Sequence, residues 1–249
     1  MARIRAIVLL GLWFSAIGII APFIITLGVI TRNENFIYGP VRFFVRLGVR
    51  LVSVRVQVSG LENLNPKQAY VLTPNHQSVI EVPLLVTYLG RNPAFLAKKE
   101  LFKFPVFGQG IRAIKVVPVD RRDRQSALRS AHLAAENLRK GKTYVVYPEG
   151  TRSPDGHLLP FKKGAFMMAI EAGVPIVPIT VSGSSTIMPK NKIKVFPGTI
   201  HIIVHPPIDT RGYSKENVAD LVERTRSLVM SRLSEQEIAG LASSKASGR

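Results

Sequence analysis

A histidine and a glutamate stand five positions apart in the stretch TPNHQSVIE, residues 73–81, directly after the apolar run at 69–72. A histidine held by a carboxylate can act as a general base near neutral pH, because the carboxylate fixes one ring tautomer. Within one regular helix, residues i and i+5 point to different sides. We therefore expect His76 in the turn before a helix and Glu81 one turn inside it, where the turn can fold the imidazole over the carboxylate. The alternative is a surface histidine beside an unrelated glutamate.

A second polar stretch, PEGTRS at residues 148–153, has residue types that suit an anion. Gly150 lets the backbone approach a bulky group, and the guanidinium of Arg152 presents a planar fork that matches phosphate oxygens. Arg121, which ends the run KVVPVDR, supplies another cation. The alternative is a solvated Glu-Gly-Thr-Arg loop without a ligand.

The elements around these stretches alternate between strands and helices, which predicts an α/β fold with a mostly parallel or mixed sheet flanked by helices. Strands are expected at 54–58, 69–72, 93–97, 115–119, 143–147, 174–181, 193–196 and 199–204. Helices are expected at 78–89, from Lys98 to a break at Pro105, at 123–140 and 163–172, and from Lys215 after a Ser214 cap. Ligands of such sheets gather beyond the carboxyl ends of the strands. Because each polar stretch follows a strand, we expect them to form one site.

The N-terminus carries no charged residue between Arg5 and Arg32. As a helix this stretch would be about 39 Å long, enough to cross a hydrocarbon core of about 30 Å with tilt. A cleaved signal peptide usually has a shorter apolar region of about 7–15 residues. We therefore predict a membrane-embedded helix that either spans the bilayer or bends at Pro22 and returns.

The next stretch carries Arg42, Arg46 and Arg50 at a spacing of four among apolar residues. This spacing predicts one stripe of guanidiniums on a helix that lies in a lipid headgroup layer, with a solvated helix face as the alternative. The expected organisation is a membrane-associating helical segment at 1–52, an α/β domain at 53–240 and a disordered tail at 241–249. If the first helix spans, the arginines that follow it place the main domain in the cytoplasm.

The chain is strongly basic, with 34 Lys and Arg against 16 Asp and Glu and a net charge of +18. This balance suits an anionic lipid surface or nucleic acid, but no aromatic-basic module is visible, so we expect no nucleic-acid partner. The absence of cysteine excludes disulfides, a thiolate nucleophile and cysteine-bound metals. His201 and His205 lie in a predicted strand that does not align them, so we expect no metal site.

Four stretches resemble the motifs of the glycerolipid acyltransferases, most closely the bacterial 1-acylglycerol-3-phosphate acyltransferases. They occur in the family's order over about residues 55–210 and read NHQSVIE, VVPVDR, YPEGTRS and VPIVPITV. Two positions depart from the family pattern: Glu81 replaces the usual Asp, and Tyr147 stands where Phe is commoner. The longer side chain of Glu81 can shift the histidine slightly but keeps its orienting function.

The resemblance implies an O-acyltransferase that needs no cofactor and transfers an acyl group from acyl-ACP or acyl-CoA to the sn-2 hydroxyl of 1-acylglycerol 3-phosphate. His76 would be the base, oriented by Glu81. The acceptor phosphate would be held by residues of the second and third motifs, namely Arg121, Glu149, Gly150, Thr151 and Arg152. The implied partners are membrane lipids and either acyl carrier protein or a coenzyme A thioester, and the implied location is the cytoplasmic side of the bacterial inner membrane.

Three alternatives remain open from the sequence. Another acceptor, such as glycerol 3-phosphate or a lyso-aminolipid, would suit the same motifs. A non-catalytic, basic membrane-surface protein would explain the charge but not the two polar stretches. Ser78 could instead be the nucleophile of a hydrolase, although no Gly-x-Ser-x-Gly turn surrounds it.

Overall fold

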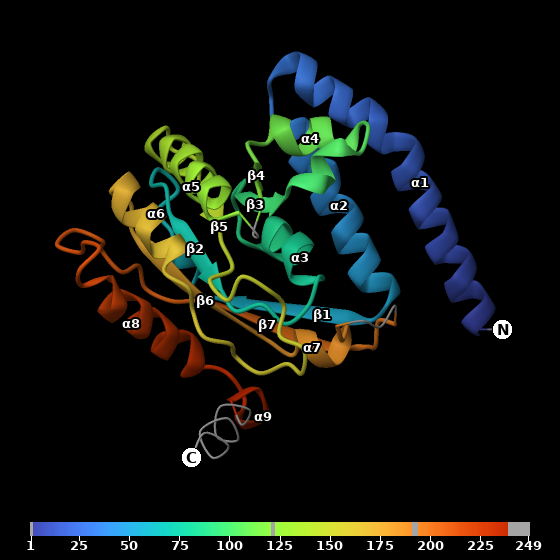
Figure 1. Ribbon diagram of the computed structural model, residues 1–249. Helices are drawn as coiled ribbons and strands as arrows, with labels where there is room; N and C mark the ends of the chain where they lie inside the picture. Colours follow the sequence, from blue (N-terminus) through green and yellow to red (C-terminus); the bar gives the residue numbers. More distant parts are fainter. Residues whose placement is uncertain (1, 121–122, 191–193, 239–249) are drawn as a thin grey trace.

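The protein is represented by a computed structural model that describes residues 2–120, 123–190 and 194–238. Within these residues a seven-stranded sheet has the order β1-β7-β6-β2-β5-β3-β4 (Figure 1). The strands are β1 (Val54–Ser59), β2 (Val71–Pro74), β3 (Ala94–Lys98), β4 (Val117–Val119), β5 (Tyr144–Val145), β6 (Ile176–Ser182) and β7 (Gly198–Val204).

The sheet is mixed, as the alternation of elements predicted. Strands β4, β3, β5, β2 and β6 run parallel to one another. Strand β7 runs antiparallel to β6, and β1 pairs parallel with β7, so these two strands point the other way. Strand β4 lies at the edge, where its Pro118 removes no hydrogen bond from a central ladder.

Helices cover both faces of the sheet (Figure 1). The α-helices are α1 (Ala2–Thr31), α2 (Asn35–Leu51), α3 (Glu81–Tyr88), α4 (Phe107–Ala113), α5 (Arg124–Arg139), α6 (Gly164–Ala172), α7 (Ser184–Ile187), α8 (Val218–Met230) and α9 (Glu235–Ile238). Two 3-10 helices, η1 (Leu61–Asn63) and η2 (Lys99–Lys103), follow β1 and β3. Helices α5, α6 and α8 pack on one face, while α2 and α3 pack on the other.

The core alternates along each central strand, because neighbouring side chains of a strand point to opposite faces. In β2, Val71 packs toward the α5, α6 and α8 side, and Leu72 packs toward α2 and α3. Tyr144 and Val145 repeat this pattern in β5. All four side chains are fully buried, which is typical of parallel strands covered on both faces.

Two helix ends carry capping residues of the usual types. The Asp123 side chain accepts a hydrogen bond from the backbone N–H of Gln125 at the start of α5. Gly173 ends α6 with a φ of +68°, a left-handed conformation that glycine adopts without strain.

Several predicted boundaries were wrong. Helix α3 begins at Glu81 rather than at residue 78, and the predicted helix at Lys98 is the 3-10 helix η2. Helix α8 begins at Val218, not near Lys215, and no side chain caps it. Residues 194–197 form no strand where 193–196 was expected, and residue 193 lies outside the described part. The predicted tail at 241–249 also lies outside it.

Helix α1 is continuous through Pro22. Its stretch Gly11–Thr31 is long and apolar enough to cross a membrane, with a mean hydropathy of 2.2, and only 6% of an 18-residue apolar segment within it is buried. Helix α1 lies against α2, where the Trp13 indole N–H donates to the carbonyl of Phe44 at 3.0 Å. The protein is therefore associated with a membrane through this N-terminal region.

The predicted arginine stripe on α2 is only partly available to lipid. The guanidinium of Arg42 donates to the carbonyls of Val86 and Arg91, at 3.2 and 2.8 Å, and to Asn92 Oδ1 at 2.6 Å. Arg42 therefore fastens α2 to the end of α3 and the loop before β3, while Arg50 is exposed.

Candidate active site

The turn between β2 and α3 brings His76 and Glu81 together. Strand β2 ends at Pro74, and the amide of Asn75 ties the turn to β6 by exchanging hydrogen bonds with Val181, at 2.8 Å to its carbonyl and 2.7 Å from its N–H. Glu81 is the first residue of α3. The His76 Nδ1 atom lies 2.7 Å from Glu81 Oε2. The expected pair is therefore present, with Glu81 one turn earlier in the helix than expected.

Glu81 is fully buried, and its carboxyl group has several hydrogen-bond partners. Its Oε1 accepts from the backbone N–H groups of Gln77 and Ser78, at 2.9 and 2.8 Å, and from the Ser184 hydroxyl at 2.6 Å. Its position in the first turn of α3 also suits negative charge. Because Oε2 then acts as the acceptor for His76, we assign the imidazole proton to Nδ1, which leaves Nε2 with a free lone pair.

The imidazole ring has one face covered by Tyr147. The two ring centroids lie 3.7 Å apart with an interplanar angle of 24°, and the His76 side chain is 13% exposed. Burial, followed by the nearby Glu81 charge, holds the pKa of the Tyr147 hydroxyl well above its ordinary value. Stacking on one face and the Glu81 hydrogen bond together fix the direction in which Nε2 points.

Residues of the third motif hold the backbone of His76 from both sides. The Glu149 Oε1 atom accepts from the His76 N–H at 2.7 Å, and Oε2 accepts from the Leu159 N–H at 3.2 Å. The Ser153 N–H donates to the His76 carbonyl at 2.8 Å. Burial raises the pKa of Glu149 to about 8, against the effect of the two backbone donors. The contacts of this carboxyl group are thus with the protein's own backbone.

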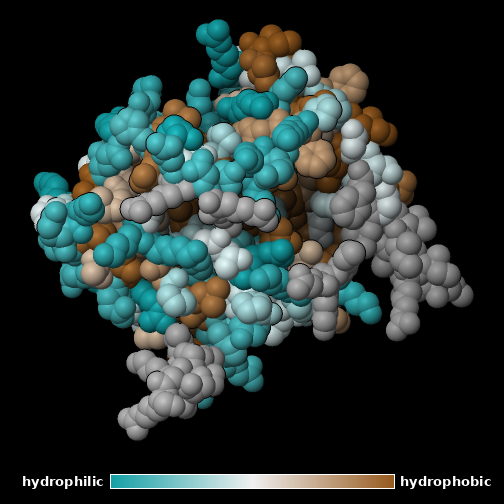
Figure 2. Space-filling view, in the orientation of Figure 1, coloured by the Kyte–Doolittle hydropathy of each residue, from teal (hydrophilic) through white to brown (hydrophobic). Residues whose placement is uncertain are grey.

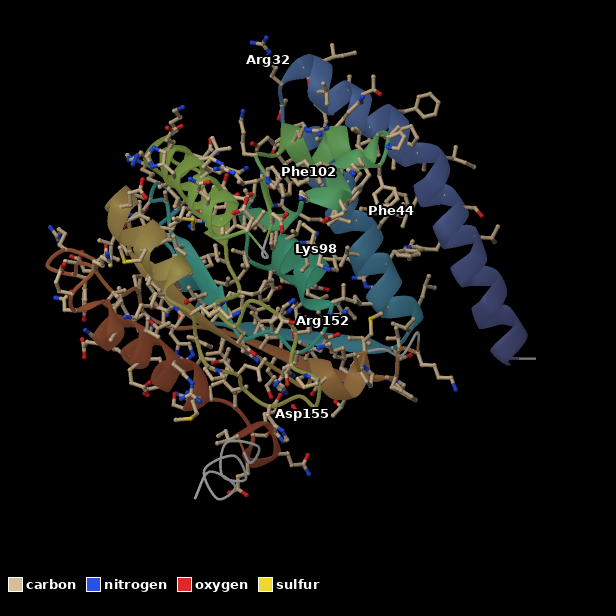
Figure 3. All side chains as sticks on the ribbon, in the orientation of Figure 1. Arg32, Phe44, Lys98, Phe102, Arg152 and Asp155 are labelled. Atoms are coloured by element: carbon tan, nitrogen blue, oxygen red, sulfur yellow. The ribbon has the colours of Figure 1, made fainter. Side chains whose placement is uncertain are left out.

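Two lysines that the sequence did not single out lie beside the Gly150–Arg152 turn. Gly150 has a φ of +74°, and a Cβ atom there would come within 3.1 Å of Lys162 Nζ. Lys190 Nζ donates to the carbonyl of Arg152 at 2.7 Å. Within the described residues, the half-buried Arg152 guanidinium forms no ion pair, and Figure 3 shows it near the middle of the molecule, below α3. Three cations therefore surround the turn.

Two predicted site residues remain, Thr151 and Arg121. Thr151 is exposed in the same turn. Arg121 lies outside the described residues, so its predicted place in the site stays a prediction. It would follow β4, which is separated from β5 by β3.

Sequence reasoning missed the residues that support Glu81 from β6. Gly183 follows β6 with a φ of +84°, and a Cβ atom there would lie 2.6 Å from the Thr199 carbonyl oxygen. This turn brings Ser184 to Glu81. Glu237 of α9 holds the turn, because its carboxyl group accepts from the Gly183 N–H at 3.1 Å and from the Ser182 hydroxyl at 2.7 Å. The Gly-Ser pair after a predicted strand was the only local signal.

The hydroxyl of Ser78, the alternative nucleophile, does not contact His76 in a hydrogen bond. Ser78 is fully buried, and its hydroxyl donates to the Met188 carbonyl at 2.7 Å rather than to His76. No group of three or more His, Cys, Asp or Glu side chains that could hold a metal occurs among residues 2–120, 123–190 and 194–238. His205 is buried, with Nε2 2.8 Å from the Thr180 hydroxyl.

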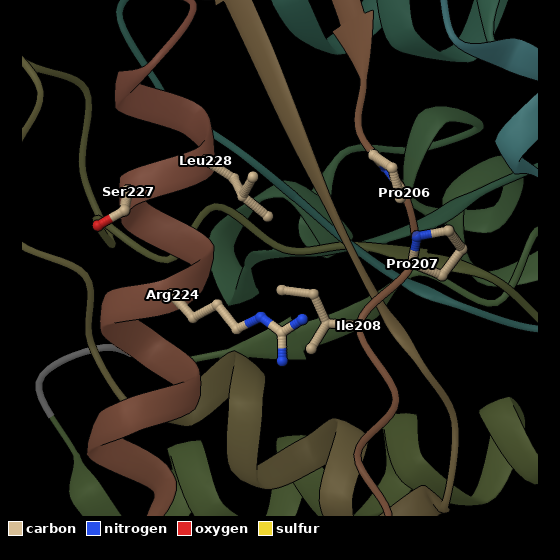
Figure 4. Close-up of a pocket in the computed structure, with 6 residues that line it drawn as sticks. All are labelled: Pro206, Pro207, Ile208, Arg224, Ser227 and Leu228. Atoms are coloured by element: carbon tan, nitrogen blue, oxygen red, sulfur yellow. The ribbon is translucent and has the colours of Figure 1, made fainter.

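A cavity of about 460 Å³ lies away from this site, between the loop after β7 and α8 (Figure 4). It is lined by Pro206, Pro207, Ile208, Arg224, Ser227 and Leu228. The lining contains neither residue of the His76–Glu81 pair and none of residues 150–152, and we assign this cavity no part in the chemistry.

Comparison with known proteins shows the family of the chain. The model of the Acyltransferase family matches residues 55–182, a range that contains both polar stretches. The chain belongs to this family. A 1-acyl-sn-glycerol-3-phosphate acyltransferase from Pseudomonas aeruginosa is 31% identical over 195 residues, which cover 78% of this chain and 75% of that protein.

Two further relatives extend the comparison. The chloroplastic 1-acyl-sn-glycerol-3-phosphate acyltransferase LPAT1 of Arabidopsis thaliana is 35% identical over 209 residues, or 80% of this chain, and this chain spans only 58% of that protein. The crystal structure of the 1-acyl-sn-glycerophosphate (LPA) acyltransferase PlsC from Thermotoga maritima aligns with a TM-score of 0.72 and 31% identity, covering 94% of this chain and all of that one. The predicted fold class is confirmed by this match.

Proposed function

We propose that this acyltransferase transfers an acyl group from a thioester donor to the sn-2 hydroxyl of 1-acylglycerol 3-phosphate, which yields phosphatidic acid. The observation that carries the proposal is the 2.7 Å contact between His76 Nδ1 and Glu81 Oε2, close to the turn that carries Arg152. The names of the Pseudomonas and Thermotoga relatives support the choice of acceptor.

In the proposed reaction His76 Nε2 takes the proton from the acceptor hydroxyl as its oxygen attacks the thioester carbonyl carbon. The new ester C–O bond forms, the C–S bond breaks, and the proton on Nε2 passes to the departing thiolate. General-base help of this kind contributes about 10²–10⁴-fold. The thioester already activates the acyl group, so the reaction needs no covalent enzyme intermediate, metal or cofactor.

Arg152 is proposed to bind the acceptor phosphate, with Lys162 and Lys190 adding positive charge around the same turn. A guanidinium can bind two phosphate oxygens at once, which would fix the hydroxyl relative to His76. Glu149 is proposed to position His76 through its backbone N–H rather than to touch the substrate. Thr151 and Gly150 would shape the turn, and Arg121 remains proposed for the same phosphate.

The test is an acyl-transfer assay in detergent with both acyl-ACP and acyl-CoA and with several lyso-lipid acceptors. His76→Ala should abolish transfer while the thermal unfolding midpoint stays near that of the wild type. His132→Ala is the matched control, because His132 also pairs with a glutamate, Glu171, but on the exposed surface of α5. Near-wild-type transfer by His76→Ala would end the proposal.

Arg152→Ala should raise the KM for the phosphate-bearing acceptor by about 10–100-fold. This factor corresponds to the loss of a charge-assisted hydrogen bond of about 1.5–3 kcal/mol. The rate at saturation should change little. Arg211→Ala, at an exposed arginine paired with Asp209, is the control and should leave KM unchanged. An unchanged KM in Arg152→Ala would remove Arg152 from the phosphate role.

We also propose that the catalytic domain lies on the cytoplasmic side of a bacterial inner membrane. Arg32, Arg42, Arg46 and Arg50 follow the apolar helix, and positive residues favour the cytoplasmic side. The sequence contains no cysteine, so Glu62→Cys introduces a single thiol. That thiol should react with a membrane-impermeant maleimide only after the inner membrane is opened, and labelling of intact spheroplasts would contradict the orientation.

A further inference from the structure

Large apolar side chains are exposed in the segment that runs from the end of β3 into α4. Phe104 is 59% exposed, Phe107 48% and Leu101 37%. Aromatic and leucine side chains are usually buried, and a cluster of exposed ones marks a binding surface. We name residues 98–112 the 98–112 surface.

The backbone between the two exposed phenylalanines is strained. Val106 has φ +62° and ψ −60°, and the Phe107 N–H donates to the Pro105 carbonyl at 2.6 Å, which is a γ-turn with the disfavoured hand. A β-branched residue rarely adopts a positive φ. Phe102, four residues before Val106, packs inward and is 7% exposed.

The 98–112 surface is attached to the apolar N-terminal helix. A Cβ atom added to Gly110 would lie 3.0 Å from Ile25 Cδ1, so α4 packs directly on α1. Away from this contact, α1 exposes Phe23 and Ile30, each by 74%. Figure 1 shows α4 beside α1, and Figure 2 shows hydrophobic side chains gathered over this part of the molecule. A bilayer that holds α1 must therefore also pass close to the 98–112 surface.

The charges around these apolar side chains are mainly positive. Lys98, Lys103 and Arg112 are exposed, Lys99 pairs with Asp120, and Glu100 is the one exposed carboxylate of the segment. Beside the segment, a cavity of about 520 Å³ opens toward α5. It is lined by Lys99, Phe102, Arg112, Lys115, Val116, Val117, Pro118, Leu133 and Asn137, without a carboxylate. Cations around an apolar patch suit the phosphates of an anionic lipid layer.

We propose that the 98–112 surface is a second membrane-contacting element, separate from α1. Phe104, Phe107 and Leu101 insert below the headgroups of an anionic bilayer, and the surrounding lysines and Arg112 contact lipid phosphates. The proposal depends on α1 lying in that bilayer and does not depend on the acyl-transfer reaction.

The experiment uses the single tryptophan of the sequence. Trp13→Phe provides a background in which Phe104→Trp or Phe107→Trp adds one fluorescent reporter to the full-length chain. Phe23→Trp reports α1, and Leu128→Trp, at a 63% exposed leucine on α5, is the matched control. Each variant is reconstituted into vesicles of phosphatidylglycerol and phosphatidylcholine with brominated acyl chains, which quench tryptophan at the depth of the bromine.

We expect a blue-shifted, quenched emission at positions 104, 107 and 23, and unquenched emission at 128. Quenching at 23 alone would overturn the proposal while leaving α1 in the membrane, and no quenching at 23 would remove its basis. Quenching at 128 equal to that at 104 would also overturn it, because the contact would not be specific. A blue shift at 104 without lipid that grows with protein concentration would indicate a second copy of this chain instead. A far-ultraviolet circular dichroism spectrum like that of the wild type shows that each variant is folded. Two separate reporters, at positions 104 and 107, keep the test valid if one of the variants does not fold.

Discussion

Replacement of Glu149 by glutamine should remove a pH dependence from the stability of the protein. The Glu149 carboxyl group is 2% exposed and contacts the backbone of His76 and Leu159. Burial raises its pKa from 4.5 to about 8. Glutamine has the same size and is neutral at every pH, so it reproduces the protonated form only.

The direction of the effect follows from which state binds the proton. Between about pH 4.5 and 8 the folded protein keeps the Glu149 proton, whereas the unfolded chain has released it. Each increase in pH therefore favours unfolding, so the stabilisation is complete below about 4.5 and is lost as the pH rises through about 8. The slope is about 1.36 kcal/mol per pH unit, or about 2.7 kcal/mol between about pH 5.5 and 7.5.

The assay is urea unfolding in detergent micelles, followed by circular dichroism at several pH values for wild type and Glu149→Gln. Over this range the free energy of unfolding of the wild type should fall by about 2.7 kcal/mol relative to that of Glu149→Gln, with equal dependence on urea. Glu62→Gln, at an exposed carboxyl group, is the control and should run parallel to wild type. Parallel curves for Glu149→Gln would refute the claim that Glu149 is a protonated, buried group.

Three other substitutions test the site and the fold. Ser184→Ala removes the 2.6 Å hydrogen bond to Glu81, so it should lower the free energy of unfolding by about 1.5–3 kcal/mol and reduce kcat more than it changes KM. Ser185→Ala should do neither, and equal effects of the two substitutions in the same transfer and unfolding assays would contradict this prediction. Tyr147→Phe keeps the stack on His76 and removes a buried hydroxyl that has no hydrogen-bond partner among the described residues. Thermal unfolding should therefore show a protein as stable as the wild type or about 1 kcal/mol more stable, and a clear loss of stability would reveal a partner for the hydroxyl. Gly60→Ala places a Cβ atom 2.0 Å from the Val204 carbonyl oxygen at a φ of +78°, so it should lower the free energy of unfolding by about 2 kcal/mol or more. Gly90→Ala, at a φ of +68° with open space around it, should lower it by about 1 kcal/mol, and similar losses of stability in the two variants would show that the contact with Val204 relaxes.

The sequence predicted the parts of the site that depend on strand order and short spacing. His76 and Glu81 were placed together because a turn before a helix brings such residues into contact, and the structure has them at 2.7 Å. The stretch 148–153 follows β5, which pairs with β2, so its position next to His76 follows from the rule for parallel strands. The general α/β fold followed from the alternation of elements.

The rest depends on contacts between residues far apart in the chain, which local patterns do not encode. Ser184 is 103 residues from Glu81, so its hydrogen bond could not be inferred from spacing. Glu149 was expected to face the substrate, yet its carboxyl group lies on the backbone of His76, 73 residues away. The arginine stripe on α2 was misjudged for the same reason, because Arg42 finds its acceptors 44 to 50 residues later.

The hold of Glu237 on the turn after β6 has a consequence for the order of events during biosynthesis. Helix α1 precedes the sheet in the chain, so it leaves the ribosome before the strands do. Glu237, which fixes Ser182 and Gly183 beside Ser184, follows these two residues by 55 and 54 positions. Helix α1 can therefore meet a bilayer while the turn beside Glu81 still lacks this support, and the proposed base His76 would be fully held only after Glu237 has been made.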